Sequence, residues 1–325
     1  WNLMWMDCIL IFPLIMQGFE QMTEDGSNYK LYTISLFYGL LCNYYICFMI
    51  CLFLVIQFVL TNHKNIFKMA EDTLRFAGTS VLAAAMAAFL LIPAYLGINT
   101  TASATRVFPE SEWYGSIWDM IKQMFILTEP IKSQNFDGGL NVYCGTFAVL
   151  LVGVYIFNTK IKWYEKLKNL IILAFLMVSF NNTLLNYIWH GFHDQYGIPN
   201  RFSFLFIFVI LSMGYEALVK IDRSQIVGTV VGIAAAFGFL VYADKNIQLD
   251  RTVLIYTWVL FGVYSVAVML LSLTKEKTRF VVSVVLAILC MTEIVYSGAK
   301  GYESNGTVNI PDYYSWDKSM RAAID

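Results

Sequence analysis

Long runs of apolar residues, separated by short polar segments, follow one another along most of the chain. A helix needs about 20 apolar residues to cross the hydrocarbon core of a bilayer. Runs of this length and composition therefore predict membrane-spanning helices and an all-α fold. We predict about ten membrane segments, at residues 1–19, 30–42, 44–61, 76–98, 142–158, 168–180, 202–219, 226–242, 252–273 and 280–297.

The apolar run over residues 30–61 is too long for one straight span. Its 32 residues would form a helix about 48 Å long, at ~1.5 Å per residue. We expect a break at Asn43, with Asn43, Tyr44 and Tyr45 forming a turn at headgroup depth, where tyrosine is favoured. One steeply tilted helix is the alternative.

The composition excludes several classes of protein. Apolar residues make up 58% of the 325 residues and charged residues only 14%, too few to cover a soluble globule of this size. With 22 Lys and Arg against 23 Asp and Glu, the chain lacks the basic excess that nucleic-acid binding requires. The six cysteines form no CxxC pair, so nothing indicates a zinc or redox motif.

Basic residues alternate between dense and sparse loops. Loops 62–75, 160–168, 220–223 and 274–279 hold 12 Lys and Arg in 33 residues, whereas loops 99–141, 181–201 and 243–251 hold 6 in 73. Cytoplasmic loops of membrane proteins carry the excess of basic residues. The dense loops are therefore predicted in the cytoplasm and the sparse loops on the outer face.

The longest predicted outer loop, 99–141, carries an amphipathic pattern. Pro109, Glu110 and Glu112 are typical of a helix start, since acidic side chains favour the positive end of the helix dipole. Apolar residues recur after them at helical spacing, namely Trp113, Ile117, Met120, Ile121, Met124 and Phe125. We expect an interfacial helix that either packs on the bundle or covers an outer cavity as a lid.

The chain becomes polar after residue 297. We assign residues 1–297 to a transmembrane helical domain and residues 298–325 to the start of an extracytoplasmic segment. Because the sequence opens with Trp1 and stops at Asp325 shortly after this change, we expect a fragment of a longer protein.

The densest group of reactive side chains lies in the predicted outer segment 181–204. His190, His193 and Asp194 have a spacing that suits a shared metal ion, and one histidine could instead carry a proton near neutral pH. Arg201 precedes an apolar run, where its planar guanidinium suits a phosphate. The alternative for each residue is interfacial anchoring or hydrogen bonding within the loop.

Other polar residues could line the same outer cavity. Asn181 follows a short apolar segment, and irregular backbone at membrane depth survives only beside a cavity or protein. Asn141 and Tyr143 open the next predicted span at the outer face. Asp7 and Glu293 are carboxylates inside apolar runs, where ionisable groups are costly and often functional.

Three motifs together resemble the YfhO family of bacterial membrane proteins. They are the stretches 43–49, 141–145 and 189–204, the last including Trp189-His190-Gly191-Phe192-His193 and Pro199-Asn200-Arg201-Phe202. Their order and spacing match along residues 1–297. Cys47 and Cys144 stand where that family usually has glycine, which affects close backbone packing more than chemistry.

The resemblance implies a bundle like that of the GT-C superfamily of polytopic glycosyltransferases. Such an enzyme in the bacterial plasma membrane takes a sugar from a polyprenyl-phosphate carrier and transfers it to a cell-envelope polymer, such as teichoic acid, on the outer face. The resemblance places the acidic catalytic residue in a loop preceding Trp1 and leaves open whether a divalent metal is needed. Membrane lipid, the carrier-linked sugar and the polymer are then the expected partners, and no nucleic acid is.

Within this picture, each named residue has an expected role. His190, His193 and Asp194 would assist catalysis. The carrier phosphate and sugar would be held by Arg201, Asn141, Tyr143, Asn181, Asn43 and Tyr44. A lipid or polymer flippase or transporter is the first alternative, although the inner half of the spans holds few ionisable groups. A non-catalytic membrane scaffold is the second.

Overall fold

The computed structural model describes residues 3–61, 65–100, 108–131, 139–193 and 200–304. Helices dominate these residues, and the described ranges contain no β-strand, only one isolated bridge between Trp113 and Asn182. The predicted all-α fold is therefore confirmed.

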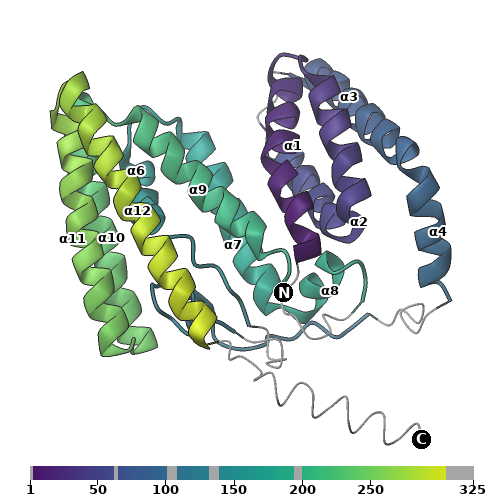
Figure 1. The fold of residues 1–325 in the computed structure, drawn as a ribbon. Coiled ribbons are helices and arrows are strands. Elements are labelled where there is room, and N and C mark those ends of the chain that lie inside the picture. Colours follow the sequence, from purple (N-terminus) through teal and green to yellow (C-terminus); the bar gives the residue numbers. More distant parts are fainter. Residues whose placement is uncertain (1–2, 62–64, 101–107, 132–138, 194–199, 305–325) are drawn as a thin grey trace, which may run out of the picture.

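The long helices form two groups (Figure 1). The first group comprises α1 (Met6–Glu24), α2 (Tyr29–Val59), α3 (Ile66–Met86) and α4 (Ala88–Ile98). The second comprises α6 (Thr146–Phe157), α7 (Trp163–Asn181), α9 (Ser203–Lys220), α10 (Ile226–Ile247), α11 (Arg251–Leu273) and α12 (Glu276–Ser304). The short elements are η1 (Leu3–Trp5), α5 (Ile117–Lys122), α8 (Thr183–Trp189) and η3 (Arg223–Gln225).

Aromatic packing joins the two groups. The buried Phe12 ring of α1 lies 4.5 Å from the ring of Phe208 and 5.8 Å from that of Phe204, both on α9. The Phe12 ring also packs against Phe53 of α2, with the ring centroids 5.8 Å apart and the rings edge to face. Such contacts add to the free energy gained by burying the rings, so Phe12 fixes α9 against α1 and α2.

Helix α2 folds back on itself at Asn43, which confirms the predicted break. Asn43 has non-helical backbone angles, φ −159° and ψ 94°. Cys47 Sγ lies 4.0 Å from the carbonyl oxygen of Leu36, although residues 11 apart in a straight helix would be roughly 16 Å apart. The Asn43 side chain accepts a hydrogen bond from the N–H of Ile46 and so caps the second half.

The predicted span 76–98 is not one straight helix. Helices α3 and α4 meet at Ala87 at an angle of 78°. Ala87 itself has φ −88° and ψ 2°, outside the α-helical region, and Pro93 lies six residues further on inside α4. The bend therefore lies at the alanine and not at the proline.

Five helices in the described ranges are long and apolar enough to cross a membrane, and a sixth span results if α3 and α4 count as one. The five are α2, α9, the stretch 223–247, α11 and α12. Helix α6 is apolar but has only 12 residues. The chain is thus a polytopic helical membrane protein, while the number of ten membrane segments stays a prediction.

The predicted dense basic loops meet at one end of the bundle, here called the basic end. One cavity there is lined by Thr61, Lys68, Lys168 and Lys220. Arg279 also donates a hydrogen bond to the carbonyl oxygen of Ile221 at 2.8 Å. The alternation of loops expected from the charges therefore agrees with the arrangement of the helices.

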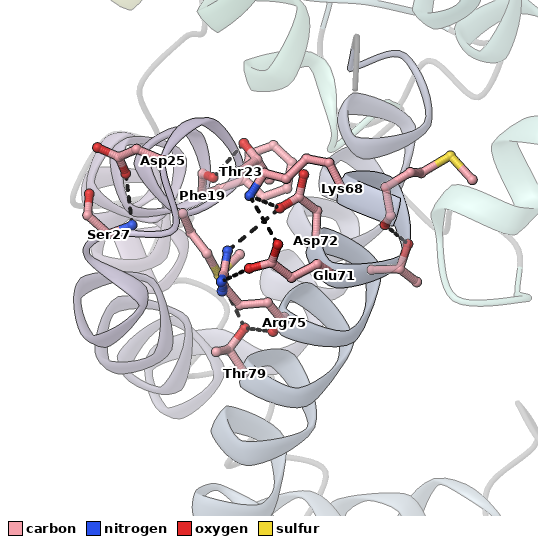
Figure 2. A network of polar contacts seen from close by, with 12 residues as sticks. Phe19, Thr23, Asp25, Ser27, Lys68, Glu71, Asp72, Arg75 and Thr79 are labelled. Atoms are coloured by element: carbon pink, nitrogen blue, oxygen red, sulfur yellow. Dashed lines mark hydrogen bonds and ion pairs between the residues drawn. The ribbon is translucent and has the colours of Figure 1, made fainter. Parts of the chain in front are cut away.

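An ion network connects successive turns of α3 at the basic end (Figure 2). The Asp72 carboxylate, almost fully buried, lies 2.8 Å from Lys68 Nζ and 3.6 Å from Arg75 Nη1. Arg75 also pairs with Glu71 one turn earlier. Two cations offset the cost of burying this carboxylate.

Two expected elements differ from the structure. Residues 110–115 are not helical, because their backbone pairs with residues 181–183: Tyr114 N–H donates to Asn181 O and Thr183 N–H to Glu112 O. The interfacial helix is therefore only α5, capped by Ser116. At the other end of the chain, α12 continues past the predicted end of the span at residue 297 to Ser304. Residues 305–325 lie outside the described ranges.

Candidate functional site

The end of the bundle opposite the basic loops carries the motif residues predicted to form the site. We call it the aromatic end and define it by Trp5, Tyr45 and Arg201. Residues from η1, the hairpin tip of α2 and the segment before α9 meet there. These segments are far apart in the sequence, so the fold brings them together.

Arg201 is held by two aromatic rings. Its Nη1 donates a hydrogen bond to the Tyr45 hydroxyl at 2.9 Å. Its Cζ lies 5.3 Å from the centroid of the Tyr45 ring and 5.7 Å from that of Trp5. Cation–π contacts of this kind orient a guanidinium without neutralising its charge. The half-buried Arg201 is thus held in a defined orientation near the end of the bundle.

The two histidines have different surroundings despite their spacing. His190 is fully buried, and its Nδ1 lies 2.8 Å from the carbonyl oxygen of Asn186. This bond places the proton on Nδ1 and leaves Nε2 as a hydrogen-bond acceptor, with no partner among the described residues. His193 is half-buried and stacks on Tyr45, with ring centroids 5.5 Å apart.

Burial lowers the pKa of His190 to about 3. The hydrogen bond to Asn186 partly opposes this shift, and the nearby Arg201 charge adds a smaller lowering effect. His190 is therefore neutral at physiological pH. A neutral imidazole suits hydrogen bonding to a hydroxyl better than electrostatic attraction of a phosphate.

The described residues contain no group of three or more His, Cys, Asp or Glu placed to hold a metal ion. Asp194, the third expected member of the histidine group, lies outside the described residues. The shared metal site therefore remains a prediction.

The side chains of Asn181 and Asn182 form hydrogen bonds that hold neighbouring segments in place. The buried Asn181 carboxamide accepts from Gly115 N–H at 3.0 Å and donates to Gly115 O at 2.8 Å. Asn182 caps α8 through Leu185 N–H and donates to Ser111. Together they fix the 110–115 segment over the end of α7, so Asn181 supports the wall of the site through the backbone.

A second chain of amides connects the Arg201 region to the segment before α6. The Asn186 side chain donates to Asn200 Oδ1 at 2.5 Å, and Asn200 Nδ2 donates to Gly139 O at 2.8 Å. Asn200 adopts a left-handed backbone, φ 49°, which asparagine tolerates better than most residues. Arg201 and the 139–145 segment are thereby held side by side.

The hairpin tip presents a different tyrosine from the one expected. Asn43 caps its helix, and Tyr44 is exposed. Tyr45 instead contacts both Arg201 and His193. Trp5 was not among the predicted site residues either; the only sequence signal for both is an aromatic residue at a predicted membrane interface.

Asn141 and Tyr143 line a cavity of about 490 Å³ between the 123–145 segment, α9 and α12. Asn141 pairs with the backbone of Ile131 through both its oxygen and its nitrogen. None of the described residues in 43–45 and 181–204 lines this cavity. The single cavity that the sequence predicted is thus two neighbouring sites. One is the group Trp5, Tyr45 and Arg201 at the aromatic end, and the other is the cavity beside Tyr143.

Glu293 of α12 lies behind the Tyr143 cavity. Its buried carboxylate accepts hydrogen bonds from the hydroxyls of Tyr143 and Tyr264 and, at 2.6 Å, from the N–H of Thr146. Thr146 is the first residue of α6, whose dipole favours a negative charge there. Asp7, the other carboxylate in an apolar run, is exposed on α1.

A larger cavity, of about 640 Å³, lies at the basic end. Ten ionisable acidic and basic side chains line it, namely Glu20, Glu24, Lys68, Asp72, Lys160, Lys162, Glu165, Lys168, Glu216 and Lys220. Several are paired with each other, including Lys168 with Glu165 and Lys220 with Glu216. Both helix groups contribute to this cavity.

Comparison with known proteins gives one match. The family model described as bacterial membrane protein YfhO matches residues 1–317. No curated protein and no solved structure matches the chain.

Proposed function

Because the chain belongs to the YfhO family of bacterial membrane proteins, we propose that it is a GT-C-type membrane glycosyltransferase. It takes a sugar from a polyprenyl-phosphate carrier and transfers it to a cell-envelope polymer, such as teichoic acid. The reaction takes place on the extracytoplasmic face of the bacterial plasma membrane, at the aromatic end of the bundle.

The observation that carries the proposal is the environment of Arg201. Its guanidinium is oriented by the Tyr45 hydroxyl and by the rings of Tyr45 and Trp5. A planar guanidinium binds phosphate oxygens through two parallel hydrogen bonds. The surrounding aromatic rings at a membrane interface suit the junction between a polyprenyl chain and its phosphate.

In this reaction the bond between the sugar C1 and the carrier phosphate breaks, and a bond between C1 and an acceptor oxygen forms. The acceptor hydroxyl gives its proton to a base, and polyprenyl phosphate leaves with the electron pair. Arg201 stabilises the charge that develops on that phosphate. His190 lies near the guanidinium, His193 stacks on the Tyr45 ring beside it, and both position the sugar or phosphate.

A transfer assay tests the proposal. Membranes that contain the protein are given a radiolabelled polyprenyl-phosphate sugar and isolated polymer, and label in the polymer is counted. We expect label transfer that depends on the protein and on a phosphate-linked donor. Membranes lacking the protein are the control, and equal labelling in both would contradict the proposal.

The charged cavity at the basic end favours one other function. A flippase or transporter needs polar groups at both faces, and ionisable side chains from both helix groups line this cavity. Under that function a labelled carrier lipid would cross vesicle membranes without any transfer of sugar. Flipping without transfer in the same preparation would favour the alternative.

A further inference from the structure

The cavity beside Tyr143 has a chemical character of its own. Its described lining residues include no Lys or Arg, and apolar side chains from α9, α12 and the segment after α5 line part of it. Those apolar residues include Phe125, Leu211 and Ile294. The buried Glu293 carboxylate lies directly behind its polar side. A carboxylate behind the wall, with no Lys or Arg among the described lining residues, disfavours an anionic ligand.

Glu293 also fixes the hydrogen-bonding role of Tyr143. The Tyr143 hydroxyl donates its one proton to Glu293 Oε1. A phenol has a single proton, so its oxygen then offers only lone pairs to the cavity. Phosphate oxygens are also acceptors, so Tyr143 in this state recognises a hydrogen-bond donor and not a phosphate.

Two further hydroxyls lie beside Tyr143, and one of them, on Ser297, belongs to the cavity wall. Ser297, which also lines the cavity, and Thr146 both lie next to the Tyr143 hydroxyl. Thr146 is 2% exposed, and its Oγ1 has no hydrogen-bond partner among the described residues. A buried hydroxyl without a partner is uncommon and marks unused hydrogen-bonding capacity.

We propose that this cavity binds a neutral polyhydroxyl group, a sugar ring or an alditol, whose hydroxyl donates to Tyr143. Sugar hydroxyls both donate and accept, and the C–H faces of such groups suit the apolar side formed by Leu211 and Ile294. That the bound group is a substrate of the enzyme rests on the proposed function. The inference divides the substrates between two features, with the carrier phosphate at Arg201 and the sugar or polymer hydroxyls at Tyr143.

Cys144 provides a direct readout of occupancy. It is a free, half-buried thiol that lines the cavity, while Cys42 is a free, half-buried thiol on α2 outside it. Membranes are treated with a small maleimide in the presence of methyl glucoside, ribitol or inorganic phosphate. Mass spectrometry then measures alkylation of Cys144 and Cys42 in the same sample. We expect methyl glucoside or ribitol to slow alkylation of Cys144 alone, and phosphate to have no effect.

Tyr143→Phe removes the acceptor oxygen together with the hydrogen bond donated to Glu293, and Tyr215→Phe on the exposed face of α9 is the control. We expect Tyr143→Phe to raise the polyol concentration for half-protection about 3- to 10-fold, as for one lost neutral hydrogen bond. Tyr215→Phe should leave it unchanged.

Protection by phosphate, absence of protection by both polyols, or equal protection in Tyr143→Phe would each overturn the inference. Failure of the transfer assay together with polyol protection would reject the transferase but not the polyol site. Sugar transfer without polyol protection of Cys144 would reject the polyol site but leave the transferase proposal standing.

Discussion

Arg201 and Tyr45 are in contact in two ways, through a 2.9 Å hydrogen bond from Nη1 to the tyrosine hydroxyl and through the guanidinium lying 5.3 Å from the ring centroid. Tyr45 follows the tip of the α2 hairpin, and Arg201 precedes α9. The contact therefore ties the hairpin of the first helix group to the second group. It orients a cation at the point where we propose a phosphate to bind.

Arg201→Lys separates a phosphate-binding role from simple anchoring. Lysine keeps the positive charge at the interface but lacks the planar fork for two parallel bonds to phosphate. We expect normal membrane abundance and a loss of sugar transfer of about 30- to 150-fold, or roughly 2–3 kcal/mol. Arg251→Lys, at the start of α11, is the matched control and should keep full activity. Full activity in Arg201→Lys would leave only the anchoring role.

The burial of His190 makes the folded protein sensitive to acid. Its pKa is about 3 in the folded chain, against about 6.5 in an unfolded one. Between these values the unfolded state binds a proton that the folded state does not, so stability falls as pH falls from about 6.5 toward 3. The contribution is about 1.4 kcal/mol per pH unit, or about 2 kcal/mol between pH 6.5 and pH 5.

Unfolding in detergent at several pH values measures this contribution. His190→Gln removes the titrating group, and we expect its free energy of unfolding to fall less steeply below pH 6.5 than that of the unmodified protein. His193→Gln is the matched control, since His193 is only half-buried, and should keep the steeper slope. Equal slopes for all three proteins would rule out His190 as the source.

Structural features that depend on a single segment could be predicted from the pattern of apolar and polar residues in that segment. The break at Asn43 was predictable because a helix formed by the 32-residue, mostly apolar run 30–61 would be longer than the bilayer is thick. Helix was wrongly predicted over residues 110–115 because their hydrogen bonds go to residues 181–183, about 70 positions away. Tertiary pairing there overrides a local pattern that would suit an amphipathic helix.

The candidate site was predictable in its residue types but not in its partners. Arg201 and the two histidines stand close together in the sequence, so their chemistry was visible. That Tyr45 and Trp5 would face Arg201 depends on how the hairpin packs against α9. Likewise, Glu293 is recognisable as a costly buried carboxylate, but its bonds to Tyr143 and Tyr264 join three distant segments.

The distribution of basic residues predicts which end of the bundle is in the cytoplasm. Lys162 is exposed at the basic end, and Asn246 is exposed near the end of α10 in a predicted outer loop. In a background without native cysteines, we expect Lys162→Cys to react with an impermeant maleimide only in inverted vesicles. Asn246→Cys should react only in intact cells. The opposite pattern would reverse the predicted orientation.

Two glycines of α10 provide a matched test of helix packing. A Cβ on Gly232 would lie 2.6 Å from Val154 Cα and 2.7 Å from Gly153 O on α6, whereas a Cβ on Gly238 would have nothing within 4 Å. Backbone cannot move aside as a flexible side chain can, so Gly232→Ala must push α6 and α10 apart. We expect it to lower the free energy of unfolding by about 1–3 kcal/mol. Gly238→Ala gains helix propensity, worth up to about 1 kcal/mol, without a clash. Denaturant unfolding of both variants in detergent should give opposite signs, and a stable Gly232→Ala would show that α6 and α10 are not packed this closely.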